Sequence, residues 1–441
     1  MSKQSKSKDL DNTGTEKALA LASLAALESA GFDRAACRVS ADELHELQAE
    51  NSEINLFRTN FETDMSLVGI ANEKKASISI NRIDQDSVDG AIADLTAMAA
   101  GSSPDSAHDI AARQDPESFS GGIIEPNYDL MYDRVSEMQT YAKEKYPLLN
   151  LRSTGITFYK RKSCFVNSND VCFQTRRGLY QVSISFSSKD GTDTSSMMYT
   201  GYSSYDLATP IYEATNVDML LQQSTEQVRT KHIPAKFQGE MIISPDCLND
   251  FLGFLLGRIG DGSLVSGTSV FKDKLNEAVT SPLLSIHSRP VDDSLTGGYW
   301  ATGDGYKAEN STIVDKGILK TYLLSQYGAN KTGLERAVNA GGNYCVDAGD
   351  STYDELLGSV KEGILITRFS GGRPNDRGDF SGIAKNSYYI KDGKLEYPVK
   401  ETTVSGNMVD LLQSISGVSL ERLNFGGSIL PWIKVSGITA S

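Results

Sequence analysis

A short glycine-rich segment holds the densest group of residues that could contact a ligand. Gly371, Gly372 and Arg373 come first, and Asp379 and Ser381 follow a few residues later. Glycine permits close approach of a backbone, and backbone N–H groups together with an arginine can bind an anionic or peptide ligand. Plain turn formation also explains the same glycines, so both interpretations stay open. We take these five residues as candidate peptide-binding residues.

The histidines do not form a recognisable catalytic or metal motif. The chain has four of them, and the one His-Glu pair is His45-Glu46. A helical zinc site needs a second histidine one turn later, and none follows. The neighbourhood also has a strand-like pattern, so we expect His45 to be a solvated surface side chain. Nucleophile-elbow and phosphate-loop motifs are missing too. The residues alone indicate no catalytic, cofactor or metal site.

Charge and composition narrow the class of protein. The 441 residues include 43 Lys and Arg against 57 Asp and Glu, giving a formal net charge of −14. A protein that tracks nucleic-acid phosphates concentrates positive charge, so we expect no direct nucleic-acid binding. No run of 18 apolar residues occurs, so we expect no membrane association through a spanning helix. The polar N-terminus and five scattered cysteines favour a cytoplasmic protein with reduced thiols.

The pattern of elements predicts an α+β fold in several units. It comprises an N-terminal α/β-type helix-strand unit and a strand meander, followed by a β-rich C-terminal domain. The predicted units are a disordered tail at 1–12, an α+β domain at 13–105, a middle helix and strand-meander domain at 123–232, and a C-terminal β-rich domain at 236–441.

Local signals place the elements of the first two units. Thr13 and Glu16 have capping-box spacing at the start of a helix. The predicted helices are 13–30, 87–100, 129–145 and a long one at 211–231; the predicted strands are a hairpin at 66–71 and 76–80 and a meander of short strands over 151–202. A Ser-, Asp-, Pro- and Gly-rich stretch at 101–122 is interpreted as a linker.

The C-terminal unit begins with a strand and a buried helix. Residues 241–243 favour a strand, and Ser244-Pro245 supplies an N-cap and an N1 proline for a helix at 246–259. That helix is apolar on most sides, which predicts burial. Beyond it, we expect many short strands, for example at 298–300, 317–324, 363–368 and 387–390.

Several strings in the C-terminal half carry a specific resemblance. They are SVFKDKL at 269–275, SPLL at 281–284, DKGILKTYLL at 315–324, GDFSG at 378–382, YIKDGKLEYPV at 389–399 and TTVSGN at 402–407. In this order they resemble the TldD/PmbA family, and the PmbA (TldE) branch more than the TldD branch. The resemblance is strong over 238–437. Over the first 230 residues only the order of elements fits.

The resemblance implies a fold, a location and a partnership. The family has an α+β N-terminal half and a β-rich C-terminal domain, and its members are cytoplasmic. TldD-type and TldE-type subunits pair as a metallopeptidase that degrades or matures unfolded peptides. An older family name, modulator of DNA gyrase, reflects genetics, and the acidic charge here argues against contact with DNA.

One departure from the family pattern concerns zinc. In TldD-type chains, a His-Glu-x-x-x-His motif on a helix after a central strand binds zinc, together with a cysteine near the C-terminus. The corresponding helix here has the sequence DFLGFLLGR at 250–258, and the corresponding C-terminal segment, 423–431, has no cysteine. The resemblance therefore implies no metal in this chain, with zinc in a TldD-type partner.

The leading hypothesis is a non-catalytic, TldE-like subunit of a metallopeptidase complex. Its partner would be a TldD-type subunit, or a second copy in a homodimer, with the C-terminal domain as the main interface. An unfolded peptide would be held by main-chain pairing at a sheet edge near 371–382, which is independent of peptide sequence. An autonomous hydrolase with an unrecognised site and a homodimeric peptide-binding scaffold remain as alternatives.

Overall fold

The computed structural model describes residues 14–51, 53–339 and 341–441. The predicted tail at 1–12 and the predicted helix cap Thr13 lie outside the described residues. Within them, the strands form one curved sheet in the N-terminal half and a second, more complex sheet in the C-terminal half. The α+β prediction is confirmed.

The N-terminal sheet contains strands from both units that the sequence analysis separated, 13–105 and 123–232. Strand β1 pairs antiparallel with β2 on one side and with β5 on the other, so the two units share one sheet. In spatial order the strands are β3 (Lys74–Ile80), β2 (Glu53–Ala71), β1 (Arg34–Glu50), β5 (Leu149–Asn167), β6 (Cys172–Asp190) and β4 (Glu117–Gly122), with β7 (Asp193–Thr194) and β8 (Met198–Ser204) also paired to β6.

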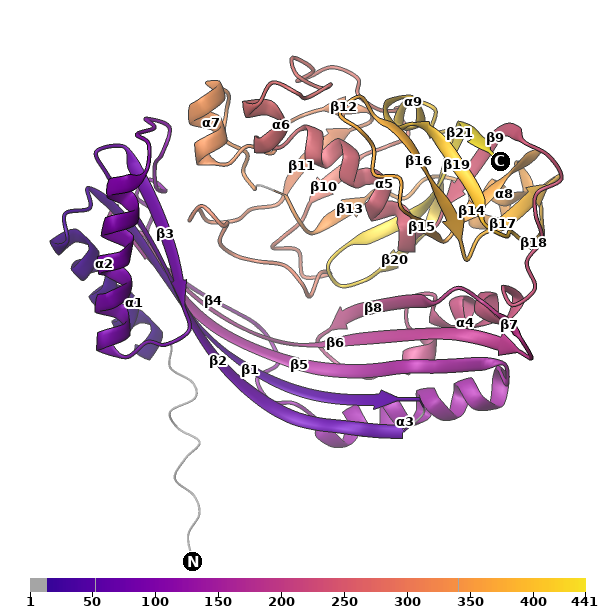
Figure 1. Ribbon diagram of the computed structural model, residues 1–441, viewed down its shortest axis with the longest axis horizontal. Helices are drawn as coiled ribbons and strands as arrows, with labels where there is room; N and C mark the ends of the chain where they lie inside the picture. Colours follow the sequence, from indigo (N-terminus) through magenta and orange to yellow (C-terminus); the bar gives the residue numbers. More distant parts are fainter. Residues whose placement is uncertain (1–13, 52, 340) are drawn as a thin grey trace, which may run out of the picture.

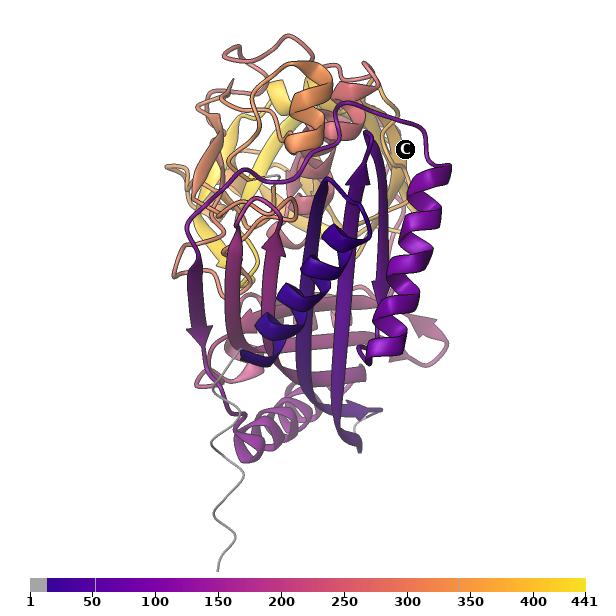
Figure 2. The same ribbon diagram turned by 90° about the vertical axis from the view of Figure 1, so that its left-hand side faces the viewer.

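Helices cover the convex face of this sheet. Figures 1 and 2 show α1 and α2 against one end of the sheet and α3 beneath its other end. Alternate residues of β1, including Cys37 and Val39, point into the core below α1 and α2, while Leu47 belongs to the core below α3 and α4. The helices are α1 (Gly14–Ser29), α2 (Gln85–Gly101), α3 (Tyr128–Lys145) and α4 (Val217–Glu226), with a 3₁₀ turn η1 (Ile211–Glu213).

The meander strands are much longer than predicted. The expectation of short strands over 151–202 was wrong, because β5 and β6 each run for 19 residues. Their polar stretches look like loops in the sequence, but cross-strand charge pairs hold them in the sheet. Arg161 lies opposite Asp42 and donates from Nε to its carboxylate at 2.6 Å, and Lys160 lies opposite Glu43 at 3.2 Å.

Two further N-terminal predictions need correction. The stretch interpreted as a linker, 101–122, ends in strand β4, which pairs parallel with β6. The long helix predicted at 211–231 is a 3₁₀ turn followed by the ten-residue α4. The chain breaks at Thr215, whose φ of 51° is incompatible with a continuous right-handed helix.

The C-terminal sheet is branched. Its main path is β12 (Ile318–Leu319), β11 (Ser311–Asp315), β10 (Ile286–Ser288), β13 (Tyr344–Val346), β21 (Ile429–Ala440), β9 (Phe237–Ile243), β14 (Glu362–Ile366), β17 (Tyr388–Lys391) and β18 (Lys394–Pro398). A branch from β21 continues through β19 (Thr402–Asn407) and β16 (Asp379–Lys385) to β15 (Arg368–Ser370), and β20 (Gly417–Asn424) pairs with β21 as well. Thr367 alone separates β14 from β15, so the chain passes directly from the main path to the branch.

Helix α5 (Pro245–Arg258) packs against β21 and β15. The other helices of this half are α6 (Asp261–Val265), α7 (Gln326–Thr332), α8 (Tyr353–Gly358) and α9 (Met408–Gln413). The prediction that the helix at 246–259 is buried is confirmed, because its leucines and phenylalanines belong to the largest C-terminal core cluster. Of the predicted strands, one does not form and another is shorter than expected. Residues 298–300 form no strand, and 317–324 contributes only the two residues of β12.

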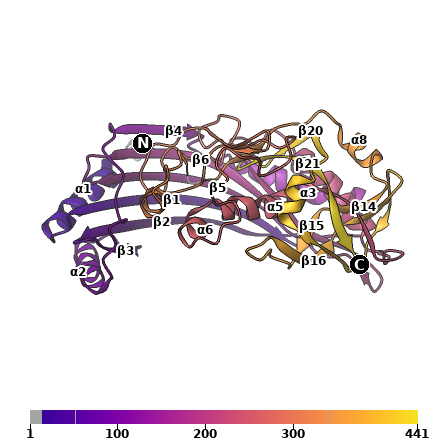
Figure 3. The same cartoon turned by 90° about the horizontal axis from the view of Figure 1, so that it is seen from above.

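The C-terminal half lies over one part of the curved N-terminal sheet (Figures 1 and 3). Direct contacts join the halves at several places. Lys331 Nζ reaches Asp105 at 2.9 Å, and Lys307 Nζ reaches Glu117 at 2.6 Å. Near the N-terminus of α5, Asn216 Nδ2 donates to the Asp246 carboxylate at 2.6 Å. These contacts fix the position of the C-terminal sheet relative to the N-terminal sheet.

Two glycines in the N-terminal half allow opposite tests of the packing. Gly90 is exposed within α2, and a Cβ there meets nothing within 4 Å, whereas a Cβ on Gly178 of β6 falls 1.7 Å from the Ile123 carbonyl oxygen. We predict that Gly90→Ala raises stability by about 1 kcal/mol, the difference in helix propensity. Gly178→Ala lowers it, because the backbone must move. Thermal unfolding of the two variants measures both effects, and equal shifts would contradict the described packing.

Candidate functional site

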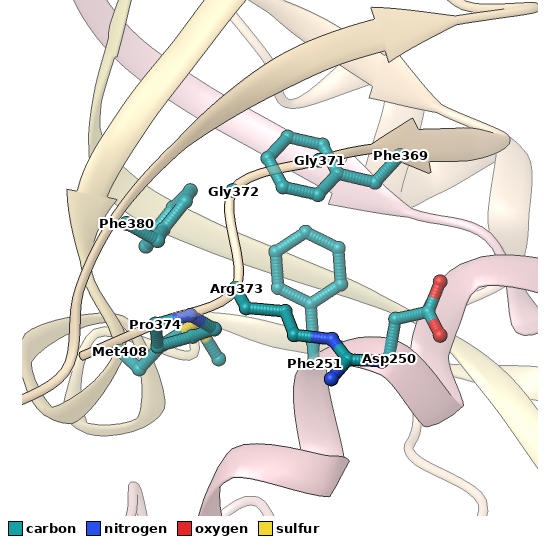
Figure 4. A pocket seen from close by; sticks show the side chains of 9 residues that line it. All are labelled: Asp250, Phe251, Phe369, Gly371, Gly372, Arg373, Pro374, Phe380 and Met408. Carbon is teal, nitrogen blue, oxygen red and sulfur yellow. The ribbon is translucent and has the colours of Figure 1, made fainter. Parts of the chain in front are cut away.

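A cavity of about 290 Å³ opens on the C-terminal half beside α5. It is the place where three of the five predicted ligand-binding residues gather. The residues that line it come from α5, β15, the following loop, β16 and the start of α9 (Figure 4): Asp250, Phe251, Phe369, Gly371, Gly372, Arg373, Pro374, Phe380 and Met408.

Helix α5 supplies one wall. Ser244 stands at the N-cap position and Pro245 opens the helix, as their sequence predicts, although Ser244 makes no side-chain cap hydrogen bond in the part of the chain described. Apolar residues at helical spacing turn most of the helix inward, so Phe251 is buried. Asp250 precedes it by one residue, which places its carboxylate about 100° around the helix and at the exposed mouth of the cavity.

Three phenylalanines form the floor. Phe251 lies 5.6 Å from Phe369 of β15 and 6.2 Å from Phe380 of β16, and Phe369 lies 5.8 Å from Phe380, all between ring centroids. The tilted and edge-on angles, 49°, 88° and 76°, are those that aromatic quadrupoles favour. Gly382 makes room for this cluster, because a Cβ there would fall 2.5 Å from the Phe369 ring.

The loop after β15 forms the opposite rim. Gly371 and Gly372 have φ of 74° and 68°, a left-handed conformation that glycine adopts without strain. A Cβ on Gly372 would also fall 2.5 Å from the Ser381 carbonyl oxygen. Downstream, Asn375 fixes the loop to β16: its N–H donates to the Asp379 carbonyl, and its Oδ1 accepts from the Asp379 N–H, both at 3.0 Å.

The structure separates the five sequence candidates into two groups. Gly371, Gly372 and Arg373 line the cavity. Asp379 and Ser381 do not, because they alternate with buried Phe380 along β16 and so point to the other face of the strand. Asp379 instead accepts hydrogen bonds from the side-chain amides of Asn407 and Asn375, which lower the pKa of its carboxyl.

The sequence analysis did not identify the acidic and apolar residues that make up most of the cavity lining. Asp250, Phe251, Phe369, Phe380 and Met408 were not predicted as ligand contacts, since a search for polar chemistry passes over apolar side chains. A usable signal was the alternation around Phe380, which marks it as inward-facing next to two outward-facing polar neighbours.

Two oppositely charged residues, Asp250 and Arg373, lie at the mouth of the cavity. Figure 4 shows the Arg373 side chain extending from the loop toward α5, where Asp250 lies. No hydrogen bond or ion pair engages either side chain among residues 14–51, 53–339 and 341–441. Burial raises the pKa of the Asp250 carboxyl. Both groups are therefore available to a ligand that carries hydrogen-bond donors and acceptors.

The structure corrects the expectation for His45. Its residue is 5% exposed rather than solvated, because the start of α3 covers it. Nε2 donates to the Glu43 carboxylate at 2.8 Å, and Nδ1 accepts from the Tyr128 hydroxyl at 2.8 Å. In the described part of the chain, no group of three or more His, Cys, Asp or Glu residues is arranged to hold a metal ion. The His45 cluster is a structural polar network.

The protein-family comparison matches the part of the chain that forms the C-terminal sheet. A sequence model described as the PmbA/TldA metallopeptidase C-terminal domain matches residues 237–441. A metalloprotease of Methanothermobacter thermautotrophicus is 28% identical over 207 residues, 44% of this chain and 45% of that protein. Metalloprotease PmbA of Escherichia coli O157:H7 is 27% identical over 245 residues, 53% of this chain and 52% of that protein. The chain thus spans about half the length of these curated relatives.

The C-terminal half, residues 237–441, matches the C-terminal domain of the PmbA/TldA metallopeptidases. The fold agrees over nearly the whole length. TldE from Thermococcus kodakarensis superposes with a TM-score of 0.80 at 18% identity, covering 96% of this chain and all of that one. Within the described residues, no helix is long and apolar enough to cross a bilayer.

The match to a metallopeptidase domain raises the question of whether α5 fits a zinc ion. Its residues at the cavity are Asp250 and Phe251, and it carries no histidine. Cys247 is its one sulfur, but burial raises the pKa of that thiol far above the ordinary value, and zinc binds the thiolate. A catalytic zinc requires three protein ligands. The residues present on α5 do not fit one.

The Glu43 network generates a stability prediction. Burial alone would raise the pKa of Glu43, but hydrogen bonds from His45 and Lys160 outweigh burial and hold the pKa below the ordinary value. Lys160 is itself buried, with its side chain 4% exposed. Glu43→Gln leaves that ammonium with only the distant Glu125 at 3.6 Å, so we predict a loss of about 3 kcal/mol at pH 7.

Because the pKa of Glu43 is lowered by folding, its contribution is present above the unfolded value near 4.3 and disappears as pH falls further. The difference between wild type and Glu43→Gln in urea unfolding should therefore shrink below about pH 4. Glu125→Gln is the matched control, because that side chain is 70% exposed and its loss should be small. Equal losses for the two variants would contradict this account of the network.

Proposed function

We propose that this chain is a TldE/PmbA-like subunit of a TldD/TldE-type metallopeptidase complex that degrades or matures unfolded peptides. In this proposal the chain binds peptide and contributes no zinc ligand, and a TldD-type partner holds the zinc. The observation that carries it is the composition of α5. The helix that corresponds to the zinc-binding helix of TldD-type chains presents Asp250 and Phe251 to its cavity and otherwise packs leucines and phenylalanines into the core.

The candidate site supports a role in holding peptide. Strand β15 pairs with β16 alone among the described strands, so its second edge has no strand partner. An extended peptide can add main-chain hydrogen bonds at such an edge whatever its sequence. Next to that edge, Gly371 and Gly372 carry no side chain that would keep a second backbone away, and Arg373 can donate to a peptide carbonyl or carboxylate.

The identity of the partner subunit is also a proposal. The chain has relatives named PmbA and TldD, and its fold matches a protein named TldE. We infer that pairing uses the C-terminal domain, with either a TldD-type subunit or a second copy. Co-purification from the native host, followed by identification of the bound chains, distinguishes the two. Peptidase activity of the single purified chain that persists in chelator would indicate an autonomous hydrolase instead.

The first prediction from this proposal concerns metal content. Chain purified without a polyhistidine tag should contain well under one zinc per molecule, because the residues of α5 offer no ligand set. Elemental analysis by mass spectrometry measures the ratio directly. A tightly bound, stoichiometric zinc ion would contradict the assignment to the zinc-free type of subunit.

The second prediction concerns Arg373. Arg373→Ala should slow turnover of an unstructured peptide by the assembled complex about ten- to a hundredfold and leave assembly unchanged, because a hydrogen bond from a charged donor contributes about 1.5–3 kcal/mol. Arg377→Ala is the matched control: Arg377 is exposed in the same loop but does not line the cavity. If the two variants behave alike, Arg373 has no role in peptide binding.

A further inference from the structure

The cavity beside α5 is lined by aromatic side chains, which main-chain pairing of a peptide does not require. An exposed sheet edge needs only backbone groups, yet this edge ends at a hollow whose floor is three phenylalanine rings and Met408. Apolar side chains from α5, β15, β16 and α9 form the floor of this cavity of about 290 Å³, which opens to solvent at its mouth (Figure 4).

The geometry of the rings favours an aromatic occupant. Phe251, Phe369 and Phe380 contact one another at tilted or edge-on angles, and all three line the cavity. A further ring in the cavity could meet their faces and edges at the centroid separations that aromatic pairs prefer, about 4.5–7 Å. The Met408 thioether adds a polarizable contact that suits an aromatic edge.

The rim indicates that the occupant carries amide groups. Asp250 offers a hydrogen-bond acceptor on one side and Arg373 a donor on the other. Neither side chain has a hydrogen-bond or ion-pair partner among the described residues. A peptide backbone supplies an N–H and a C=O on either side of each side chain, which matches one acceptor and one donor at the mouth. The volume is just below the range for small-molecule sites and suits one large side chain.

We propose that this cavity binds the aromatic side chain of a single residue in an extended peptide, with the flanking amides at Asp250 and Arg373. This inference rests on the proposed role in peptide binding and adds selectivity to it: the chain positions peptides by one aromatic residue, while sheet-edge pairing tolerates the rest of the sequence.

Titration calorimetry of the full-length chain with capped tripeptides tests the proposal. The probes are N-acetyl-Ala-Phe-Ala-amide and N-acetyl-Ala-Ala-Ala-amide. We expect the phenylalanine peptide to bind at least tenfold more tightly, as burial of an aromatic side chain predicts. Phe369→Leu should weaken it about two- to tenfold, because aromatic pairs contribute about 0.5–1.5 kcal/mol beyond area. Phe57→Leu, on an exposed phenylalanine of β2, should leave it unchanged.

A second measurement keeps the proposal testable should Phe369→Leu not fold. The wild-type chain is irradiated with a capped tripeptide that carries p-benzoylphenylalanine in the central position. The crosslink should map to Met408 or to the segment 369–374. Crosslinks elsewhere, or equal affinity for the phenylalanine and alanine peptides, would overturn the aromatic site. Neither measurement needs a partner or turnover, so failure of the complex proposal and failure of this one are distinguishable.

Discussion

The burial of α5 is the constraint on which the C-terminal half depends. The helix follows β9 directly and packs against β21 and β15, so it is enclosed by apolar residues from the main sheet path and from its branch. A helix in that position must be apolar on most of its surface. Leucines and phenylalanines satisfy this requirement in α5, and the helix contains no histidine and no glutamate. Within α5, Asp250 and Phe251 are the two residues that line the cavity, Asp250 exposed and Phe251 buried.

The start of α5 also joins the two halves of the molecule. Asp246, in its first turn, accepts hydrogen bonds from Asn216 at 2.6 Å and Thr200 at 3.4 Å, both from the N-terminal half. Burial raises the pKa of this carboxyl. Arg368, at the start of β15, donates to the Met197 carbonyl near β8. The cavity therefore lies on elements whose position the N-terminal sheet helps to fix, and a preformed site of this kind loses less entropy on binding.

Local patterns in the sequence were sufficient for elements that short-range chemistry determines. Ser244-Pro245 marked the start of α5, and the Asn72-Glu73 turn of the β2–β3 hairpin has the two positive φ angles that a tight hairpin turn demands. Family strings identified the C-terminal domain. Long-range pairing was not visible. The charged run around Lys160 belongs to a strand only because β1 supplies Asp42 and Glu43 opposite it. Likewise, His45 is buried only because α3 covers it.

Part of the candidate site was predictable because it, too, is a local pattern in the sequence. Gly371, Gly372 and Arg373 form a local motif, and the structure places all three at the cavity. The phenylalanine cluster joins Phe251 to Phe369 and Phe380, more than a hundred residues away, and no local pattern reports that contact. Asp379 and Ser381 share the motif but not the face of the strand, because side chains alternate. Reasoning from residues that are adjacent in sequence therefore identified the residues at the rim of the cavity, but not the phenylalanines of its floor.

Hydrogen–deuterium exchange of the full-length chain, with and without a saturating unstructured peptide that contains phenylalanine, tests the central claim most directly. The claim is that peptide binds where α5, β15 and the glycine-rich loop meet. The account predicts slower exchange in residues 369–382, with smaller changes along α5 and at the start of α9. Protection confined to the N-terminal sheet, or exchange that the peptide leaves unchanged throughout the chain, would contradict it.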